Sequence, residues 1–91
     1  MNLSSKEILA MNLKYYRFLL QLTQAEFAYK ATIDLKYYVE LENAHKKPSI
    51  EMLDKLALQI NKLAGKNIVS SNELITYYPD HKVDKWRVDK T

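Results

Sequence analysis

The chain has 91 residues, a formal net charge of +3 and no cysteine. This length fits one small domain with a single hydrophobic core. The absence of cysteine excludes disulfides, a thiolate metal site and a thiol nucleophile. No apolar run reaches the roughly 18–20 residues that a membrane span needs, and the start lacks a signal-peptide pattern. We therefore expect a cytoplasmic protein. Its mild positive charge permits nucleic-acid binding without arguing for it.

One glycine and two prolines leave few turn signals, and the apolar residues recur at helical spacing, so an all-α fold is predicted. Ser4 is the predicted start of the first helix, where it forms a capping box with Glu7. One face of this helix is expected to be buried, because its apolar residues recur at steps of one, three and four: Ile8, Leu9, Leu13, Tyr16 and Leu20.

Two short helices separated by a three-residue break come next, which is the order that a helix-turn-helix unit needs. Thr23 is the predicted N-cap of the first, with Glu26 at the third helical position. Asp34 is the predicted N-cap of the second, which covers residues 35–42. The helix-turn-helix proper is therefore expected over residues 23–42.

Pro48 prevents the third helix from continuing through the next loop, and Ser49 is predicted to cap a fourth helix that Gly65 ends. Its buried stripe is expected to contain Ile50, Leu53, Leu56, Ala57 and Ile60. A short fifth helix is predicted within "SSNELITYY". The domain would then span residues 1–78, and residues 79–91 would form an extended or disordered tail.

The two faces of the third helix have different expected roles. Tyr38 and Leu41 fall on the same side as Ile33, so they are expected in the core, with the Tyr38 hydroxyl reaching the domain edge. The opposite, outer face carries Leu35, Lys36, Tyr37 and Glu40.

Residues 12–60 resemble the helix-turn-helix domain of the Xre/Cro family of phage and bacterial repressors. The motifs that carry the resemblance are "LKYYR", "LTQAEFA", and "LEN" followed by "KP". The resemblance implies a five-helix, lambda-repressor-like DNA-binding domain, usually dimeric, that binds operators of two half-sites. Three turns lack the glycine that is usual in the family: Thr32, Ala44 and the "FLLQL" segment before Thr23. A left-handed non-glycine residue costs on the order of 1 kcal/mol, so slightly altered or strained turns are expected there.

The resemblance also implies that the outer face of the third helix contacts base edges in the major groove. Lys36 can reach O6 and N7 of guanine, and Leu35 can contact a thymine methyl. Tyr37 can contact a base edge or a phosphate. Glu40 either accepts a hydrogen bond from cytosine N4 or is a solvated charge.

Five residues are expected to contact phosphates. Gln24 opens the second helix, where free backbone amides and the helix dipole attract a phosphate, and family members commonly use glutamine there. The others lie in the loop after the third helix or on the first helix: Asn43, Lys46, Lys47 and Lys14. Arg17 and Glu42 match residues that form a partly buried ion pair in the family, which fixes the first helix against the third.

No catalytic, metal or cofactor site is predicted. The chain has no glycine-rich phosphate loop and no nucleophile paired with a base. His81 beside Asp80 and Asp84 has the composition of a weak metal site, but a solvated tail is the favoured interpretation. We therefore expect a non-enzyme.

Two functions stay open. The first is a sequence-specific regulator of transcription, a repressor by the resemblance, that binds double-stranded DNA. The second is the antitoxin of a toxin–antitoxin pair, which binds a toxin and its own operator. Trp86 and Val88 alternate with charges, as in a strand that adds to a partner. A homodimer through the fifth helix and the tail is expected, and the tail is a candidate site for another protein partner.

Overall fold

The computed structural model describes residues 2–81. They form α1 (Ser5–Leu19), α2 (Gln24–Ala31), α3 (Leu35–Glu42), α4 (Ile50–Ala64), α5 (Ser71–Leu74) and the 3₁₀ turn η1 (Pro79–His81). The predicted all-α fold with five α-helices is confirmed over this range. The predictions for Trp86 and Val88 lie outside the described residues. None of the helices between residues 2 and 81 combines the length and apolar character needed to cross a membrane.

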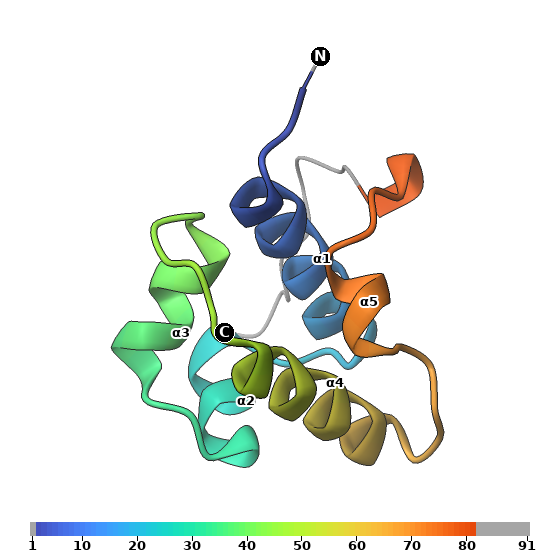
Figure 1. Cartoon of the computed structure of the whole chain (residues 1–91). Coiled ribbons are helices and arrows are strands. Elements are labelled where there is room, and N and C mark those ends of the chain that lie inside the picture. The colour runs from blue at the N-terminus through green and yellow to red at the C-terminus, as the bar shows by residue number, and fades with distance from the viewer. Residues whose placement is uncertain (1, 82–91) are drawn as a thin grey trace.

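Helix α1 runs through the middle of the domain, with α3 on one side and α5 on the other (Figure 1). It also contacts η1, while α4 packs against α2 and α5. The core forms where these helices meet and is built from Leu9, Leu13, Tyr16, Phe27, Ala28, Ala31, Ile33, Tyr38, Leu41, Leu56, Ala57, Ile60, Val69 and Leu74.

Local capping contacts set the helix starts at the predicted residues. The Ser4 hydroxyl accepts a bond from the backbone N–H of Glu7 (3.2 Å), and the Glu7 carboxylate accepts one from the backbone N–H of Ser4 (2.9 Å). Thr23 and Glu26 form the same reciprocal pair at α2. The residues before α3 and α4 also accept a backbone N–H from their first turns: Asp34 and Ser49. The predicted N-caps are confirmed.

Four helix ends share one C-terminal motif, in which a left-handed residue follows the helix. After α1, the N–H of Gln21 donates to the carbonyl of Phe18, and the next N–H donates to the carbonyl of Arg17. The ends of α2, α3 and α4 repeat this pair of bonds. The left-handed residues have φ of 57°, 59°, 61° and 76°, in the order Gln21, Thr32, Ala44 and Gly65. The three turns without glycine therefore adopt the conformation that glycine favours.

Replacing Thr32 with glycine should raise the free energy of unfolding by about 1 kcal/mol, because a left-handed β-branched residue costs more than the extra freedom of an unfolded glycine. Thr32 is exposed, and the bond that its carbonyl accepts from Lys55 Nζ does not depend on the side chain. Thermal unfolding should show a midpoint roughly 4–8 °C higher.

The reverse change provides the control. Gly65→Ala should lower stability by a similar amount through backbone conformation alone, because an added Cβ at Gly65 meets no atom within 4 Å. Equal stability of wild type, Thr32→Gly and Gly65→Ala would show that these left-handed positions carry no strain.

The predicted buried stripe of α4 is wrong at its first residue. Ile50 is 75% exposed, whereas Leu56, Ala57 and Ile60 are buried. Burial increases along this face of the helix, from exposed Ile50 through half-buried Leu53 to buried Ala57. The helical face was predicted correctly, but the start of α4 extends beyond the core.

The end of the described chain packs on α1, so the prediction of a solvated His81 is wrong. His81 is 8% exposed, and its ring stacks on Tyr15 with 3.5 Å between centroids. Its Nδ1 lies 2.7 Å from Oδ1 of Asn12. The amide nitrogen of Asn12 donates to the carbonyls of Leu74 and Thr76, so its oxygen is the acceptor and His81 Nδ1 is the donor. A buried asparagine distant in sequence thus fixes this segment.

Stability should fall as the pH drops below about 6.5, the ordinary value for histidine. Burial lowers the pKa of His81, and the charge of Asp80 opposes this only partly. The unfolded chain therefore takes up the proton first as the pH falls. The free energy of unfolding has its full value above the unfolded pKa and decreases until the folded pKa is passed.

Denaturant unfolding at about pH 7.5 and about pH 5 measures this effect. His81→Gln, which keeps a donor for Asn12, should reduce the difference between the two conditions. Exposed His45 provides the matched control, and an equal response of His45→Gln and His81→Gln would contradict the assignment.

Candidate nucleic-acid interface

Helices α2 and α3 form a compact pair at one edge of the domain. They pack on each other across a three-residue turn, and α3 also packs on α1, on the side opposite α5 (Figure 1). Ile33, Tyr38 and Leu41 are buried on the inner face, as predicted. The other side of α3 faces outward.

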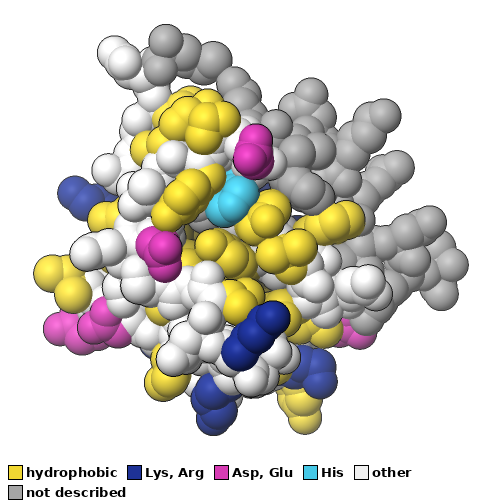
Figure 2. Space-filling view, turned by 90° about the vertical axis from the view of Figure 1, so that its right-hand side faces the viewer, with side chains coloured by type: hydrophobic (Ala, Val, Ile, Leu, Met, Phe, Trp, Pro, Cys, Tyr) yellow, Lys and Arg dark blue, Asp and Glu magenta, His cyan; other side chains and the backbone are white. Residues whose placement is uncertain are grey.

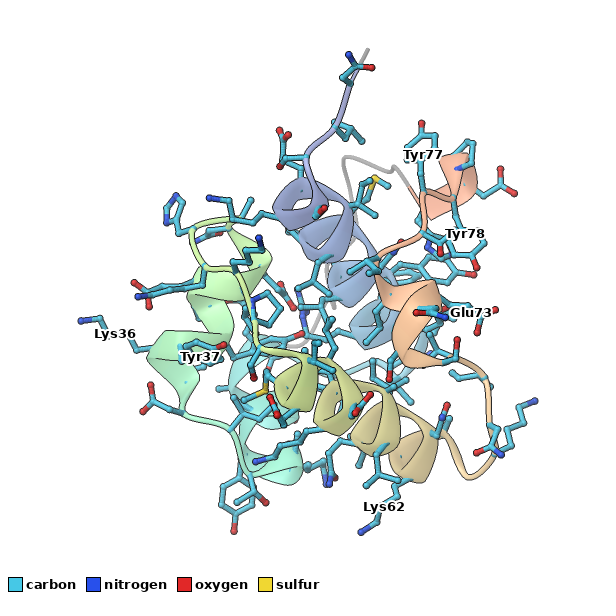
Figure 3. The ribbon with its side chains drawn as sticks, in the orientation of Figure 1. Lys36, Tyr37, Lys62, Glu73, Tyr77 and Tyr78 are labelled. Carbon is cyan, nitrogen blue, oxygen red and sulfur yellow. The ribbon has the colours of Figure 1, made fainter. Side chains whose placement is uncertain are left out.

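The outer face of α3 is most accessible in its first turn. Leu35 is 45% exposed, Lys36 is exposed, and Figure 3 shows Lys36 directed away from the domain. Tyr37 and Glu40 are half-buried, and Tyr37 packs against the core. Leu35 and Lys36 are therefore the side chains of this face best placed to reach an external surface.

A buried polar network holds α3 from behind, centred on the carboxylate of Glu42. Oε2 accepts bonds from Arg17 Nε (2.7 Å) and from the Tyr38 hydroxyl. Oε1 accepts bonds from Arg17 Nη2 (2.9 Å) and from Gln24 Nε2 (3.0 Å). Arg17 Nη1 also donates to the carbonyl of Leu22 (3.0 Å). This network, made by Arg17, Gln24, Tyr38 and Glu42, connects α1, α2 and α3.

The expected ion pair between Arg17 and Glu42 is present, with side chains only 8% and 0% exposed. Burial alone would lower the pKa of Arg17, but the hydrogen bonds and charge of Glu42 outweigh burial and raise it. Burial raises the pKa of Tyr38 well above its ordinary value, and the Glu42 charge adds to this shift. The Tyr38 hydroxyl therefore stays protonated and donates.

The Tyr38 hydroxyl was predicted to reach the domain edge, and this is wrong. It points to Glu42, four residues later on the same helix. Residues at this spacing are neighbours on one face of a helix, one turn apart. A buried carboxylate needs donors, and Tyr38 supplies one from α3.

The predicted phosphate contacts occupy different environments. Asn43, Lys46 and Lys47 are exposed in the loop after α3, whereas Lys14 on α1 is half-buried. Gln24 is half-buried and turns its amide to Glu42. An amide nitrogen carries two N–H groups, so a bond from Gln24 to a phosphate is compatible with this contact.

Two tertiary contacts were missed in the sequence, the bond from Gln24 to Glu42 and the bonds made by Asn12. The bond between Gln24 and Glu42 links residues 18 apart and has no local signal. Asn12 did have a signal, because it lies three residues after Leu9 and four before Tyr16, which places it on the buried stripe of α1. A polar residue at such a position indicates a buried hydrogen-bonding role.

Comparison of the sequence with models of protein families gave a match. A model described as helix-turn-helix matches residues 13–63, more than half of the chain, from α1 to near the end of α4. The chain belongs to the Cro/C1-type helix-turn-helix family. Comparison with curated proteins and with solved structures gave no match.

Membership of the helix-turn-helix family assigns the general role of the chain. It is a DNA-binding regulator of transcription. Helix α3 is the second helix of the unit, the one that lies in the major groove in helix-turn-helix proteins. The outer face of α3 is therefore the candidate DNA-reading surface.

Proposed function

We propose that the protein is a cytoplasmic, sequence-specific repressor. It inserts α3 into the major groove of a double-stranded DNA operator. The observation that carries this proposal is the exposed first turn of α3, with Leu35 and Lys36 on a helix held from behind by the buried network. A recognition helix that is already fixed in the free protein loses little conformational entropy when it binds DNA. The protein acts by binding rather than by catalysis.

The proposed contacts divide into two groups with different physical roles. Base edges are contacted from the outer face of α3 by Leu35, Lys36, Tyr37 and Glu40. Phosphates, which position the domain without reading sequence, are contacted by Lys14, Gln24, Asn43, Lys46 and Lys47.

Selection of bound sites from random duplex DNA tests the proposal. We expect enrichment of one palindromic sequence whose half-sites lie about one helical turn, or roughly 34 Å, apart. A selection that enriches no sequence over several rounds would leave only non-specific DNA binding and contradict a sequence-specific repressor.

We expect a homodimer through α5 and the tail, because the two-fold symmetry of a dimer matches the two half-sites of a palindromic operator. Ile75 and Tyr77, directly after α5, are 42% and 46% exposed and form apolar surface beside this helix. Removing residues 82–91, which retains buried His81, should weaken dimerisation and operator affinity together. Light scattering and DNA titration measure the two effects. A truncated protein that remains dimeric at micromolar concentration would exclude the tail from the interface.

The antitoxin alternative uses the same DNA-binding surface and adds a toxin as partner. Its expected signature is a small protein that co-purifies with the full chain and is lost when residues 82–91 are removed. A full chain that purifies alone from its native cells, while still binding its operator, would favour the simple repressor.

A further inference from the structure

A groove of about 630 Å³ opens on the side of the domain formed by the C-terminal ends of α1 and α4 and by η1. Its apolar walls come from the ends of α1 and α4 and from the segment after α4: Leu19, Leu20, Leu63 and Ile68. The rings of Tyr15 and His81 also line this groove. Figure 2 views this side and shows hydrophobic side chains gathered around a histidine. Leu19, at the end of α1, is 49% exposed.

We propose that this groove receives the side chain of Trp86 from the C-terminal segment, residues 82–91, of the same chain. The last described residue, His81, is itself part of the groove wall, so the segment begins at the groove. Trp86 follows five residues later, and five extended residues span at most about 17 Å. The tether therefore limits Trp86 to the neighbourhood of the groove.

The chemistry of the segment matches the groove. Trp86 is the only tryptophan of the chain, with Val83 three residues before it and Val88 two residues after it. An aromatic side chain removes roughly 150–250 Å² from water when it is buried, and a groove of this size has room for an indole and a neighbouring valine.

Docking within one chain is favoured over docking into a second copy. A short tether holds the attached segment at an effective concentration in the millimolar range. At micromolar protein, the segment of the same chain therefore outcompetes that of another molecule. The proposal rests neither on the proposed dimer contact nor on DNA binding.

The fluorescence of Trp86 tests the proposal on the full chain, because one tryptophan reports one environment. The expected emission lies at shorter wavelength, and acrylamide quenches it more weakly, than in a free peptide of residues 79–91. Both values should stay constant from nanomolar to high micromolar protein. Emission identical to that of the peptide overturns the proposal, and a blue shift that disappears on dilution assigns the groove to a second copy instead.

A pair of exposed leucines provides a matched comparison. Leu19→Asp places a charge in the groove and should shift the emission and the quenching constant to the values of the free peptide. Leu58→Asp changes a residue on α4 that is 58% exposed and does not line the groove, so it should retain the wild-type values. Equal effects of the two changes, with helical circular dichroism intact, contradict docking in this groove.

Discussion

Replacing Glu42 with alanine should lower the free energy of unfolding by about 3–5 kcal/mol, the cost of breaking a buried ion pair by removing one partner. The change leaves the Arg17 guanidinium buried without a counter-charge and the Tyr38 hydroxyl without its acceptor. Small domains are stable by about 5–15 kcal/mol, so this loss is a large fraction of the total free energy of unfolding. Urea unfolding at neutral pH measures the loss.

A double-mutant cycle separates the ion pair from simple loss of packing. Arg17→Met alone should be similarly harmful, because it leaves the carboxylate of Glu42 buried and unpaired. The double variant Arg17→Met/Glu42→Leu should recover much of the loss, since an apolar pair in place of a buried ion pair is often neutral or stabilising. If Glu42→Ala alone costs less than about 1 kcal/mol, the pair behaves as a surface salt bridge and the buried network does not hold α3.

Lys36→Ala should weaken binding to the preferred operator by roughly 1–3 kcal/mol and binding to scrambled DNA much less. Lys36 lies in the exposed first turn of α3 and points away from the domain (Figure 3), where a major-groove base edge is the expected partner. Its loss should therefore relax discrimination at one base pair. Titrations of specific and scrambled duplexes measure the two affinities.

Lys47→Ala provides the matched control, because Lys47 is also exposed but lies in the loop after α3. It should weaken binding to all duplexes alike and reduce the salt dependence by about one phosphate contact. Equal losses for Lys36→Ala on both duplexes would make Lys36 a phosphate contact instead. Unchanged binding by both variants would mean that α3 is a surface helix without a DNA-reading role.

The sequence alone determined where the helices begin and end. Ser4, Thr23, Asp34 and Ser49 cap the helices as predicted, because each cap joins a residue to its neighbour three positions later. The turns without glycine were also identified from sequence. Their left-handed conformation follows from local bonds that close each helix end.

The outer face of α3 was likewise predicted from helical periodicity, which places Leu35 and Lys36 away from the buried Tyr38 and Leu41. Periodicity gives the direction of a side chain around the helix axis. It does not give the depth of the core along that axis, which is why Ile50 was assigned to the core although it is exposed.

The family resemblance implied the buried pair of Arg17 and Glu42, but only the tertiary structure decided the partners of the other buried polar groups. His81 is buried against Asn12, 69 residues earlier, and Gln24 donates to Glu42, 18 residues later. The inward direction of the Tyr38 hydroxyl depends on the same carboxylate. A buried donor or acceptor must find its partner among the groups that the folded chain brings within about 3 Å. That set is fixed by how α1, α2, α3 and η1 pack, and no local pattern in the sequence specifies it.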